Sequence, residues 1–229
     1  MRTIVFDIET ASYPFESLNE SQREYLLRYA EKEKTEELRA EKRDEAIRYM
    51  SLYPFTANVV AIGIYDIDKE KSFVYYNDPS GGEWSSDEKN TFYKGVNEAE
   101  MLSSFWRIAE VADRFITFNG RNFDAPFLML RSAMLKIRPT KNLVGKRYDT
   151  SSHIDLLEQF TFFGLTRKFN LDFYCNAFGI ESPKSKGISG MEVKTMYEAG
   201  RVKDIAVYCG EDVFATYQLY RIWNEYLNI

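Results

Sequence analysis

Cysteine is scarce in this sequence, and its scarcity excludes two kinds of structure. Cys175 and Cys209 are the only cysteines among 229 residues. Two cysteines are too few for a disulfide framework, and their separation is unlike the paired spacing of a zinc site. We therefore expect both to be reduced thiols, in the core or at the surface.

The chain also lacks a membrane-spanning run and an excess of positive charge. No apolar stretch approaches the roughly 18 residues of a membrane helix, and Asp7 lies where the apolar part of a secretory leader would be. We therefore expect a soluble, cytoplasmic protein with no membrane partner. The sequence has 30 Lys and Arg residues and 35 Asp and Glu residues, which gives a net charge of -5. This net charge argues against extensive sequence-independent binding to phosphate backbones. It is compatible with a small nucleic-acid site in which metal ions contact the phosphates.

What is present is an ordinary globular composition, 45% hydrophobic and 28% charged. A chain of this length is enough to bury a sizeable core. We predict a single domain over residues 1–229, without internal repeats or a disordered tract.

The stretch Ile4–Thr10 carries two acids at alternating positions of a predicted strand. Side chains two apart on a strand share a face, so Asp7 and Glu9 point to one side while Phe6 and Ile8 point to the opposite layer. Like charges held close together raise each other's pKa and destabilise the fold unless a cation lies between them. A divalent-cation site and a strand end that emerges into solvent both explain this stretch.

A highly charged segment follows over about residues 16–50, with ten acids, eight bases and neither Pro nor Gly. Its charge spacing favours an exposed helix, and residues 31–37 have almost nothing to bury. We predict one long or hairpinned helical insertion. It serves either as a solvated spacer or as an arm that binds a partner protein.

Strands and helices alternate in the rest of the chain. Apolar runs predict strands at residues 58–65, 71–76, 114–118 and about 153–157, with a loop rich in Gly, Ser and Asp at residues 79–89. Apolar residues at helical spacing predict helices over about 97–112 and 202–227, within a helical pattern from Thr166 onward. We therefore predict an α/β layer structure in which the first three strands form an antiparallel meander.

A further acid, Asp124, follows the predicted strand at residues 114–118 through the turn Asn119-Gly120-Arg121-Asn122-Phe123. Ligands of α/β sheets bind just past strand ends, which favours a functional role for this acid. An aspartate that starts a helix and is favoured by the helix dipole is the alternative explanation.

The last predicted helix carries Tyr208 and Asp212 four residues apart, and therefore on one face. Gly210 lies between them and indicates close approach by another backbone, because glycine costs about 1 kcal/mol in a helix interior. A surface aspartate beside a packed tyrosine is the alternative.

Asp7, Glu9, Asp124 and Asp212, with Tyr208 before the last, resemble the DEDDy class of 3′–5′ exonucleases of the ribonuclease H-like superfamily. The likeness is to the proofreading-exonuclease-like domains related to family B DNA polymerases, and it extends over nearly the whole chain. Asp7-Ile8-Glu9-Thr10 resembles the first motif, Asn119 to Asp124 the second, Tyr208 to Asp212 the third, and His153-Ile154-Asp155-Leu156 a segment between the last two. The resemblance implies an α/β fold: a ribonuclease H-like mixed sheet, with an antiparallel meander and parallel strands flanked by helices, and a helical insertion after the first strand.

The resemblance further implies a two-metal 3′–5′ exonuclease whose partner is single-stranded nucleic acid with a free 3′ end, with DNA favoured over RNA. Hard oxygen ligands suit Mg²⁺ or Mn²⁺. Two ions roughly 3.5 to 4 Å apart activate a water and stabilise the leaving oxygen. In this scheme Asp7 bridges both ions, Glu9 and Asp212 complete the first, and Asp124 holds the second. Tyr208 orients the attacking water, because its unperturbed pKa of about 10 makes it a poor base.

Substrate contacts are also implied by the resemblance. Thr10 and Asn119 correspond to positions near the terminal nucleotides, and Phe123 would stack on a base, which tolerates any sequence. A place in the core explains Phe123 equally well.

His153 and Asp155 are the other candidates between the second and third motifs. The related DEDDh class uses a histidine shortly before its last aspartate, where this chain has Tyr208, so we expect a structural role for His153. Asp155 is expected to support the site without binding metal. Two interpretations are open for three basic residues: they contact phosphates of the substrate, or, more simply, they are ordinary charged residues at the surface. These residues are Arg121, Arg167 and Lys168.

Two other functions also fit the sequence. One is a ribonuclease or internally cutting nuclease of the same fold. The other is a catalytically silent module that binds nucleic acid or a protein through the insertion. No polymerase region follows the third motif before Ile229, which predicts a domain that acts alone or in trans.

Overall fold

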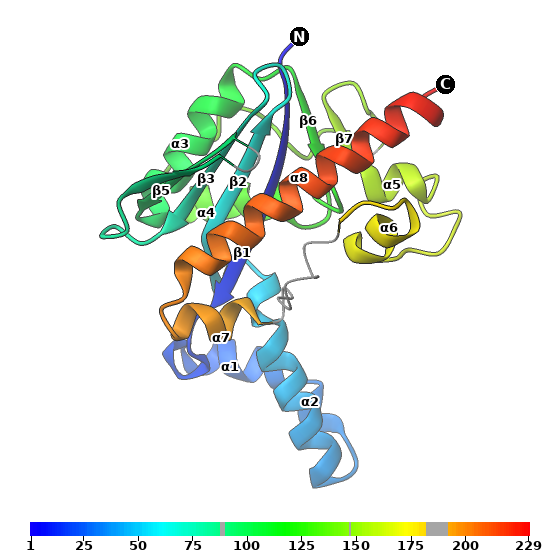
Figure 1. Ribbon diagram of the computed structural model, residues 1–229. Coiled ribbons are helices and arrows are strands. Elements are labelled where there is room, and N and C mark those ends of the chain that lie inside the picture. The colour runs from blue at the N-terminus through cyan, green and yellow to red at the C-terminus, as the bar shows by residue number, and fades with distance from the viewer. Residues whose placement is uncertain (88–89, 147, 182–191) are drawn as a thin grey trace.

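A mixed β-sheet organises the structure, a computed structural model that describes residues 1–87, 90–146, 148–181 and 192–229 (Figure 1). In these residues the sheet has seven strands in the order β4-β5-β3-β2-β1-β6-β7. The strands are β1 (Thr3–Ser12), β2 (Ala57–Asp66), β3 (Lys71–Asn77), β4 (Glu83–Ser86), β5 (Thr91–Val96), β6 (Arg114–Thr117) and β7 (His153–Asp155). β1, β2 and β3 form an antiparallel meander, whereas β6 and β7 run parallel to β1. The predicted combination of a meander with parallel strands is confirmed.

Helices cover both faces of the sheet. They are α1 (Glu20–Leu27), α2 (Glu36–Arg48), α3 (Glu98–Glu110), α4 (Asp124–Met134), α5 (Leu156–Phe160), α6 (Leu171–Ala177), α7 (Val193–Glu198) and α8 (Val202–Tyr226). Three short 3₁₀ turns accompany them: η1 (Phe15–Ser17), η2 (Ala30–Lys32) and η3 (Tyr49–Leu52). Among the described residues, no helix combines the length and the apolar character needed to cross a membrane.

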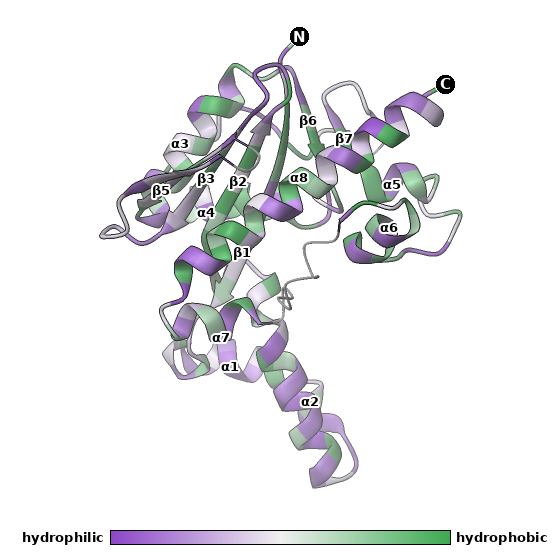
Figure 2. Ribbon diagram, viewed as in Figure 1, coloured by the Kyte–Doolittle hydropathy of each residue, from purple (hydrophilic) through white to green (hydrophobic). Residues whose placement is uncertain are grey.

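The side chains of β1 alternate between two layers of core. Ile4, Phe6 and Ile8 pack with α3 and α4 on one face. Val5 and Ala11 pack with α7 and α8 residues on the other face, where α8 crosses the sheet (Figure 1). Hydrophobic residues follow the strands in this region (Figure 2). The odd-numbered positions of β1, which include both acids, therefore face α8.

Glycine in the middle of β2 allows α8 to approach the sheet closely. A Cβ added to Gly63 would lie 2.7 Å from Val213 Cγ2 and 3.1 Å from the backbone oxygen of Cys209. The first distance is shorter than real Cβ contacts and the second is tighter than most, so any larger residue here would push α8 away from the sheet. Gly63 is also the partner of Asp7 in the β1–β2 register. The close approach thus lies beside the first acid.

Gly210 has a different role from the one predicted. A Cβ added there would meet the side chains of Val74 and Tyr93, at 3.3 and 3.4 Å, and no backbone atom is among its nearest neighbours. The predicted close approach of two backbones is therefore wrong for Gly210 and occurs at Gly63.

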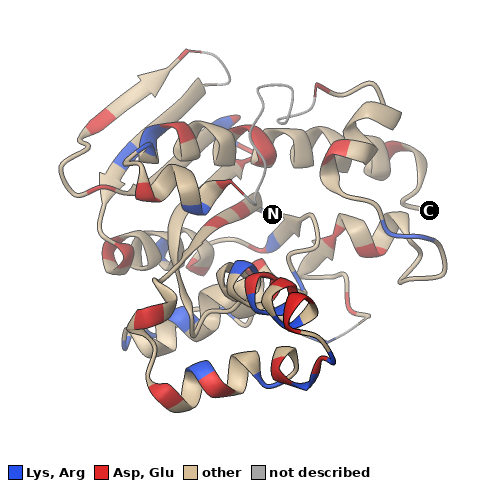
Figure 3. Cartoon of the chain, turned by 90° about the horizontal axis from the view of Figure 1, so that it is seen from below, with Lys and Arg blue, Asp and Glu red and all other residues tan. Residues whose placement is uncertain are grey.

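The segment after β1 is a helical hairpin, and we call residues 20–52 the arm. Asn19 and Thr35 cap its two helices through their side chains. The helix α2 buries no residue, and positions of both charge signs alternate along the arm in the view from below (Figure 3). Met50 is fully buried and anchors the end of the arm to the body. Of the two predicted forms of the insertion, the structure therefore has the hairpin.

Two strands were not predicted, the edge strand β4 and its neighbour β5. β4 falls inside the loop predicted at residues 79–89, and β5 lies in residues to which no element was assigned. The stacked rings of Trp84 and Tyr93, with centroids 3.7 Å apart, join these strands, so cross-strand aromatic packing outweighs the turn-rich composition. Residues 88–89 of the predicted loop and 182–191 of the predicted helical region lie outside the described residues. Both cysteines are buried free thiols.

Candidate active site

Two carboxylates of β1 point toward α8. Asp7 and Glu9 share a face of the strand, and Glu9 is only 7% exposed. The register with β2 shifts between Glu9 and Thr10, an irregularity that re-aims the residues after it. The local alternation of β1 therefore places both acids on the covered face of the sheet.

α8 brings a third carboxylate from the other end of the chain. The carboxylate oxygens of Asp7, Glu9 and Asp212 include one set that lies within 4.8 Å of one another. Tyr208 lies one helical turn before Asp212 and is also buried. The Sγ of Cys209 lies 3.7 Å from the backbone oxygen of Asp7, a contact that ties α8 to β1 at this point.

The three carboxylates repel one another in a buried setting. Burial is the largest cause of the raised pKa of Asp7, followed by the charges of Asp124, Asp212 and Glu9. Burial also raises the pKa of Glu9, followed by the charges of Asp212 and Asp124. Each of these contributions opposes ionisation, so the charged form needs a compensating cation. Carboxylate oxygens this close together are the ligands that Mg²⁺ and Mn²⁺ take, and the residues therefore fit a divalent ion.

Asp124 lies beside these acids, with one oxygen engaged elsewhere. It is the first residue of α4 and accepts a 2.9 Å hydrogen bond at Oδ1 from the backbone N–H of Ile8. Burial raises the pKa of Asp124 to about 7, although this hydrogen bond opposes the rise. Its charge is the largest electrostatic influence on Asp7. The structure thus brings three predicted acids into one cluster and places the fourth next to it.

Tyr208 is held as a neutral phenol. Burial is the main cause of its raised pKa, and the charges of Asp212, Glu9 and Asp7 add to it. A hydrogen bond to Asp212 acts in the same direction. A phenol that keeps its proton donates a hydrogen bond and does not serve as a base.

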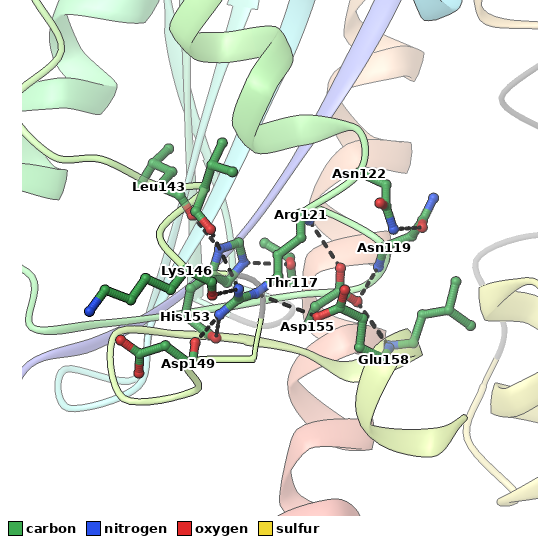
Figure 4. Close-up of polar contacts among 12 residues, drawn as sticks. Thr117, Asn119, Arg121, Asn122, Leu143, Lys146, Asp149, His153, Asp155 and Glu158 are labelled. Carbon is green, nitrogen blue, oxygen red and sulfur yellow. Dashed lines mark hydrogen bonds and ion pairs between the residues drawn. The ribbon is translucent and has the colours of Figure 1, made fainter. Parts of the chain in front are cut away.

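Asp155 holds the turn that carries the second motif (Figure 4). Its Oδ1 accepts hydrogen bonds from the backbone N–H groups of Asn119 and Leu157, at 2.8 and 3.0 Å. Its Oδ2 accepts one from the N–H of Arg121 at 3.0 Å. Burial still raises the pKa of Asp155 against these bonds. The residue fixes the backbone that leads into Asp124.

Arg121 is a buried structural residue, and its interpretation as surface charge is wrong. It is 8% exposed. Its guanidinium donates to the backbone oxygens of Lys146, at 2.7 Å, of His153, at 2.6 Å, and of Asp149 (Figure 4). These bonds tie the turn after β6 to the chain that enters β7. Arg167 and Lys168, by contrast, are exposed.

His153 is buried and neutral. Its Nδ1 lies 2.7 Å from the carbonyl oxygen of Leu143, which only accepts, so Nδ1 carries the proton. Its Nε2 then accepts from the hydroxyl of Thr117 at 2.8 Å. Burial lowers the pKa of His153 to about 4. These contacts agree with a structural role.

The three predicted substrate residues each have a contact within the protein. The Thr10 hydroxyl donates to the Ser51 carbonyl at 2.7 Å. Asn119 adopts a left-handed backbone conformation, with φ of 62°. Phe123 is partly buried and lies against the core and the ring of Phe127, at 5.6 Å between centroids. Their contact with nucleotides stays a prediction.

Sequence reasoning missed Gly63 and the structural role of Arg121, two residues that shape the site. Gly63 allows the close approach of α8 to β2, next to Asp7, and a glycine within an apolar strand was the available signal. Arg121 fixes the second motif through backbone oxygens, which have no sequence signature.

Comparisons with known proteins bear on this arrangement. A family model described as a predicted 3′–5′ exonuclease related to the exonuclease domain of PolB matches residues 56–226. This match includes Asp124, Tyr208 and Asp212, and it begins after β1 and the arm. No curated protein matches the chain.

Among solved structures, the fold is similar to that of the family B DNA polymerase from the hyperthermophilic archaeon Pyrobaculum calidifontis, with a TM-score of 0.61 and 17% identity. The likeness covers 98% of this chain and 24% of the polymerase chain. The chain therefore spans about a quarter of that polymerase's length, and the shared fold is ribonuclease H-like.

Proposed function

This chain belongs to the family of predicted 3′–5′ exonucleases related to the exonuclease domain of PolB, and from that premise we propose that it is a metal-dependent 3′–5′ exonuclease. The proposed substrate is single-stranded nucleic acid, with DNA favoured over RNA. The observation that carries the proposal is the convergence of Asp7, Glu9 and Asp212 within 4.8 Å, with Glu9 buried and the other two half-buried. Asp124 and the neutral phenol of Tyr208 lie against the same cluster.

The acids divide into two groups of proposed ligands. The charges of Asp124, Asp212 and Glu9 all act on Asp7, which suits a carboxylate shared between two ions. Glu9 and Asp212 complete the first ion's ligands, and Asp124 contributes to the second. Two bound Mg²⁺ or Mn²⁺ ions would acidify a water and neutralise charge on the leaving oxygen.

Tyr208 supplies orientation in this proposal. Its raised pKa keeps the proton on the hydroxyl, which donates toward the carboxylates or toward the attacking water. Thr10, Asn119 and Phe123 border the end of β1 and the second motif, and we assign them to the terminal nucleotides. Stacking on Phe123 would accept any base, as a sequence-independent trimming enzyme requires.

The test is digestion of 5′-labelled linear single-stranded DNA, RNA of the same sequence, and circular single-stranded DNA. We expect Mg²⁺ or Mn²⁺ to support stepwise shortening of the linear strand from its 3′ end while circles stay intact. Asp7→Ala and Asp212→Ala should abolish shortening. Asp204→Ala is the matched control, because Asp204 is on the same helix and pairs with Arg201 at the surface.

Three outcomes would reject the proposal in different ways. Cleavage of circles would indicate an internally cutting nuclease. Binding without metal-stimulated product would indicate a silent binding module. Full activity in either alanine variant would remove the assigned residues from the site.

A further inference from the structure

An aromatic groove lies where the arm meets the body. Its volume is about 590 Å³, and its walls include Tyr25, Arg28, Tyr29, Tyr53 and Phe55. The four aromatic residues are 65%, 66%, 48% and 56% exposed, in that order. Rings this exposed and this close together are uncommon on a surface that has no ligand.

The charge of the groove is positive although the arm as a whole is acidic. Among the described residues that line it, Arg28 is the only charged one. Two acids of the arm are paired with one of its bases: Arg43 contacts Glu31 at 2.7 Å and Glu36 at 2.8 Å. The groove thus presents one cation to a ligand and no carboxylate.

Arg28 is already stacked on the aromatic wall. Its guanidinium carbon lies 3.5 Å from the ring centroid of Tyr25 and 4.6 Å from that of Tyr29. Its Nη1 donates to the backbone oxygen of Tyr25 at 3.2 Å. Flat rings beside a fixed guanidinium are the chemistry that takes up unpaired bases and their phosphates. A peptide would use the apolar part of the walls alone, whereas an unpaired nucleotide uses both the ring faces and the Arg28 guanidinium.

The groove is joined to the acidic site through the end of β1. The backbone N–H of Tyr13 donates to the oxygen of Thr56, a lining residue, at 2.9 Å. Tyr13 follows Glu9 by four residues of extended chain, roughly 13 Å. A single strand spans a length of roughly 13 Å with about four nucleotides or fewer, at 3.4 Å or more each.

The base of the arm is fixed to the body beside this groove. Arg131 donates to the hydroxyl of Tyr13 at 2.8 Å and to the backbone oxygen of Pro54 at 3.2 Å. It also pairs with Glu98 at 2.6 Å. The aromatic wall therefore keeps a defined place relative to the end of β1.

We propose that this groove binds unpaired nucleotides of the strand whose 3′ end occupies the acidic site. Tyr25, Tyr29, Tyr53 and Phe55 stack on bases, and Arg28 contacts a phosphate. The inference rests on the proposed exonuclease function for the direction of the strand. It gives the arm a role in holding substrate instead of a partner protein.

The test is binding of 5′-fluorescein-labelled dT12 to the full chain by fluorescence anisotropy, in EDTA so that no metal-dependent hydrolysis occurs. Replacing both Tyr25 and Tyr29 by Ala should raise the Kd by about tenfold or more, because each stacked base contributes strongly. Arg28→Ala should also weaken binding and reduce the slope of log Kd against log salt by about 0.7, the value for one phosphate on a single strand. More than half of each tyrosine is exposed, so both variants should fold, and a melting curve checks this.

Two matched controls are available outside the groove. Tyr226→Ala removes a ring that is 67% exposed near the end of α8, and Lys34→Ala removes an exposed cation of the arm. Both should bind dT12 as the wild type does. Equal loss in the controls, or wild-type binding by the Tyr25/Tyr29 variant, would overturn the inference, and the latter result would favour a protein ligand.

Hydrolysis measured separately distinguishes the two proposals. If the wild type fails to bind dT12 in EDTA but shortens dT3 in Mg²⁺, the groove inference fails and the exonuclease stands. If it binds dT12 through the groove but hydrolyses neither strand, the groove stands and the exonuclease fails.

Discussion

Two buried acidic regions of this molecule handle their charge in opposite ways. Asp155 is fully buried and surrounded by donors, with backbone N–H groups of Asn119, Arg121 and Leu157 directed at its oxygens. Asp7 and Glu9, on the neighbouring part of the sheet, face other carboxylates. The protein thus stabilises the charge of Asp155 with hydrogen-bond donors, whereas it places like charges next to Asp7 and Glu9.

The difference separates a structural acid from a candidate functional one. An acid that receives several hydrogen bonds stabilises the backbone that donates them. Acids that raise one another's pKa destabilise the metal-free fold. Such clusters are typical of functional sites, where a bound ligand compensates for the repulsion. Asp124 lies between the extremes, with one hydrogen bond from Ile8 and a pKa of about 7.

Asp7→Asn should have the largest effect on activity of the substitutions that test the difference between Asp7 and Asp155. We expect hydrolysis of single-stranded DNA to fall by about a thousandfold or more, because a central charge-bearing ligand is lost. The Tm of the metal-free protein should rise, since one repelling charge is gone. Thermal melting in EDTA and in Mn²⁺ measures this, and Asp204→Asn is the control. A lower Tm in EDTA would contradict the repulsion that we infer.

Tyr208→Phe should have the next largest effect. Losing the hydroxyl should reduce kcat by roughly 10- to 100-fold through a poorly placed water, while the Mn²⁺-dependent rise in Tm is retained. Tyr226→Phe, on the exposed end of α8, should leave kcat unchanged. A Tyr208→Phe enzyme with wild-type kcat would remove Tyr208 from the mechanism.

Asp155→Asn should show the reverse pattern to Asp7→Asn. An amide accepts fewer of the backbone bonds, so we expect a loss of about 2 kcal/mol in the free energy of unfolding. Activity should fall only about tenfold, through displacement of the turn that carries Asp124. Urea unfolding and initial rates measure the two effects. An activity loss as large as that of Asp7→Asn would make Asp155 part of the site itself.

His153 should produce the smallest effect on activity, and its contribution to the pH dependence of stability should appear only in acid. Its pKa is about 4 in the folded protein against an ordinary 6.5, so the native state binds fewer protons between these values. Stability should therefore fall as the pH drops from about 6.5 to 4, by about 3 kcal/mol in all from this group. His153→Gln should flatten that part of the profile in urea unfolding measured across the range. An unchanged slope would mean that His153 is charged in the native protein.

The sequence was sufficient for the parts of the fold and site that depend on local pattern. Alternation in β1 predicts the shared face of Asp7 and Glu9, and helical spacing predicts that of Tyr208 and Asp212. The charged, Gly-free segment predicts the helical arm. Whether the acids of β1 and those of α8 meet depends on packing between segments that are distant in the sequence, which periodicity does not predict. The order of the exonuclease-like motifs along the chain predicted it.

Other features depend on contacts that leave no local pattern. Arg121 is buried because backbone oxygens from residues 146, 149 and 153 converge on it. Asp124 turns one oxygen to Ile8 because β1 leaves an N–H unpaired by β6 there. β4 forms within a turn-rich stretch because Trp84 stacks on Tyr93 of the neighbouring β5. Backbone partners and ring pairs of this kind are not encoded in residue spacing.

The most direct measurement is an anomalous difference map from a crystal soaked in Mn²⁺. Our account predicts one ion among the oxygens of Asp7, Glu9 and Asp212 and a second between Asp7 and Asp124, with Asp155 bound to backbone N–H groups and no metal. A map with no ion among the first three carboxylates at saturating Mn²⁺ would contradict the central claim that these acids are held together to bind divalent cations.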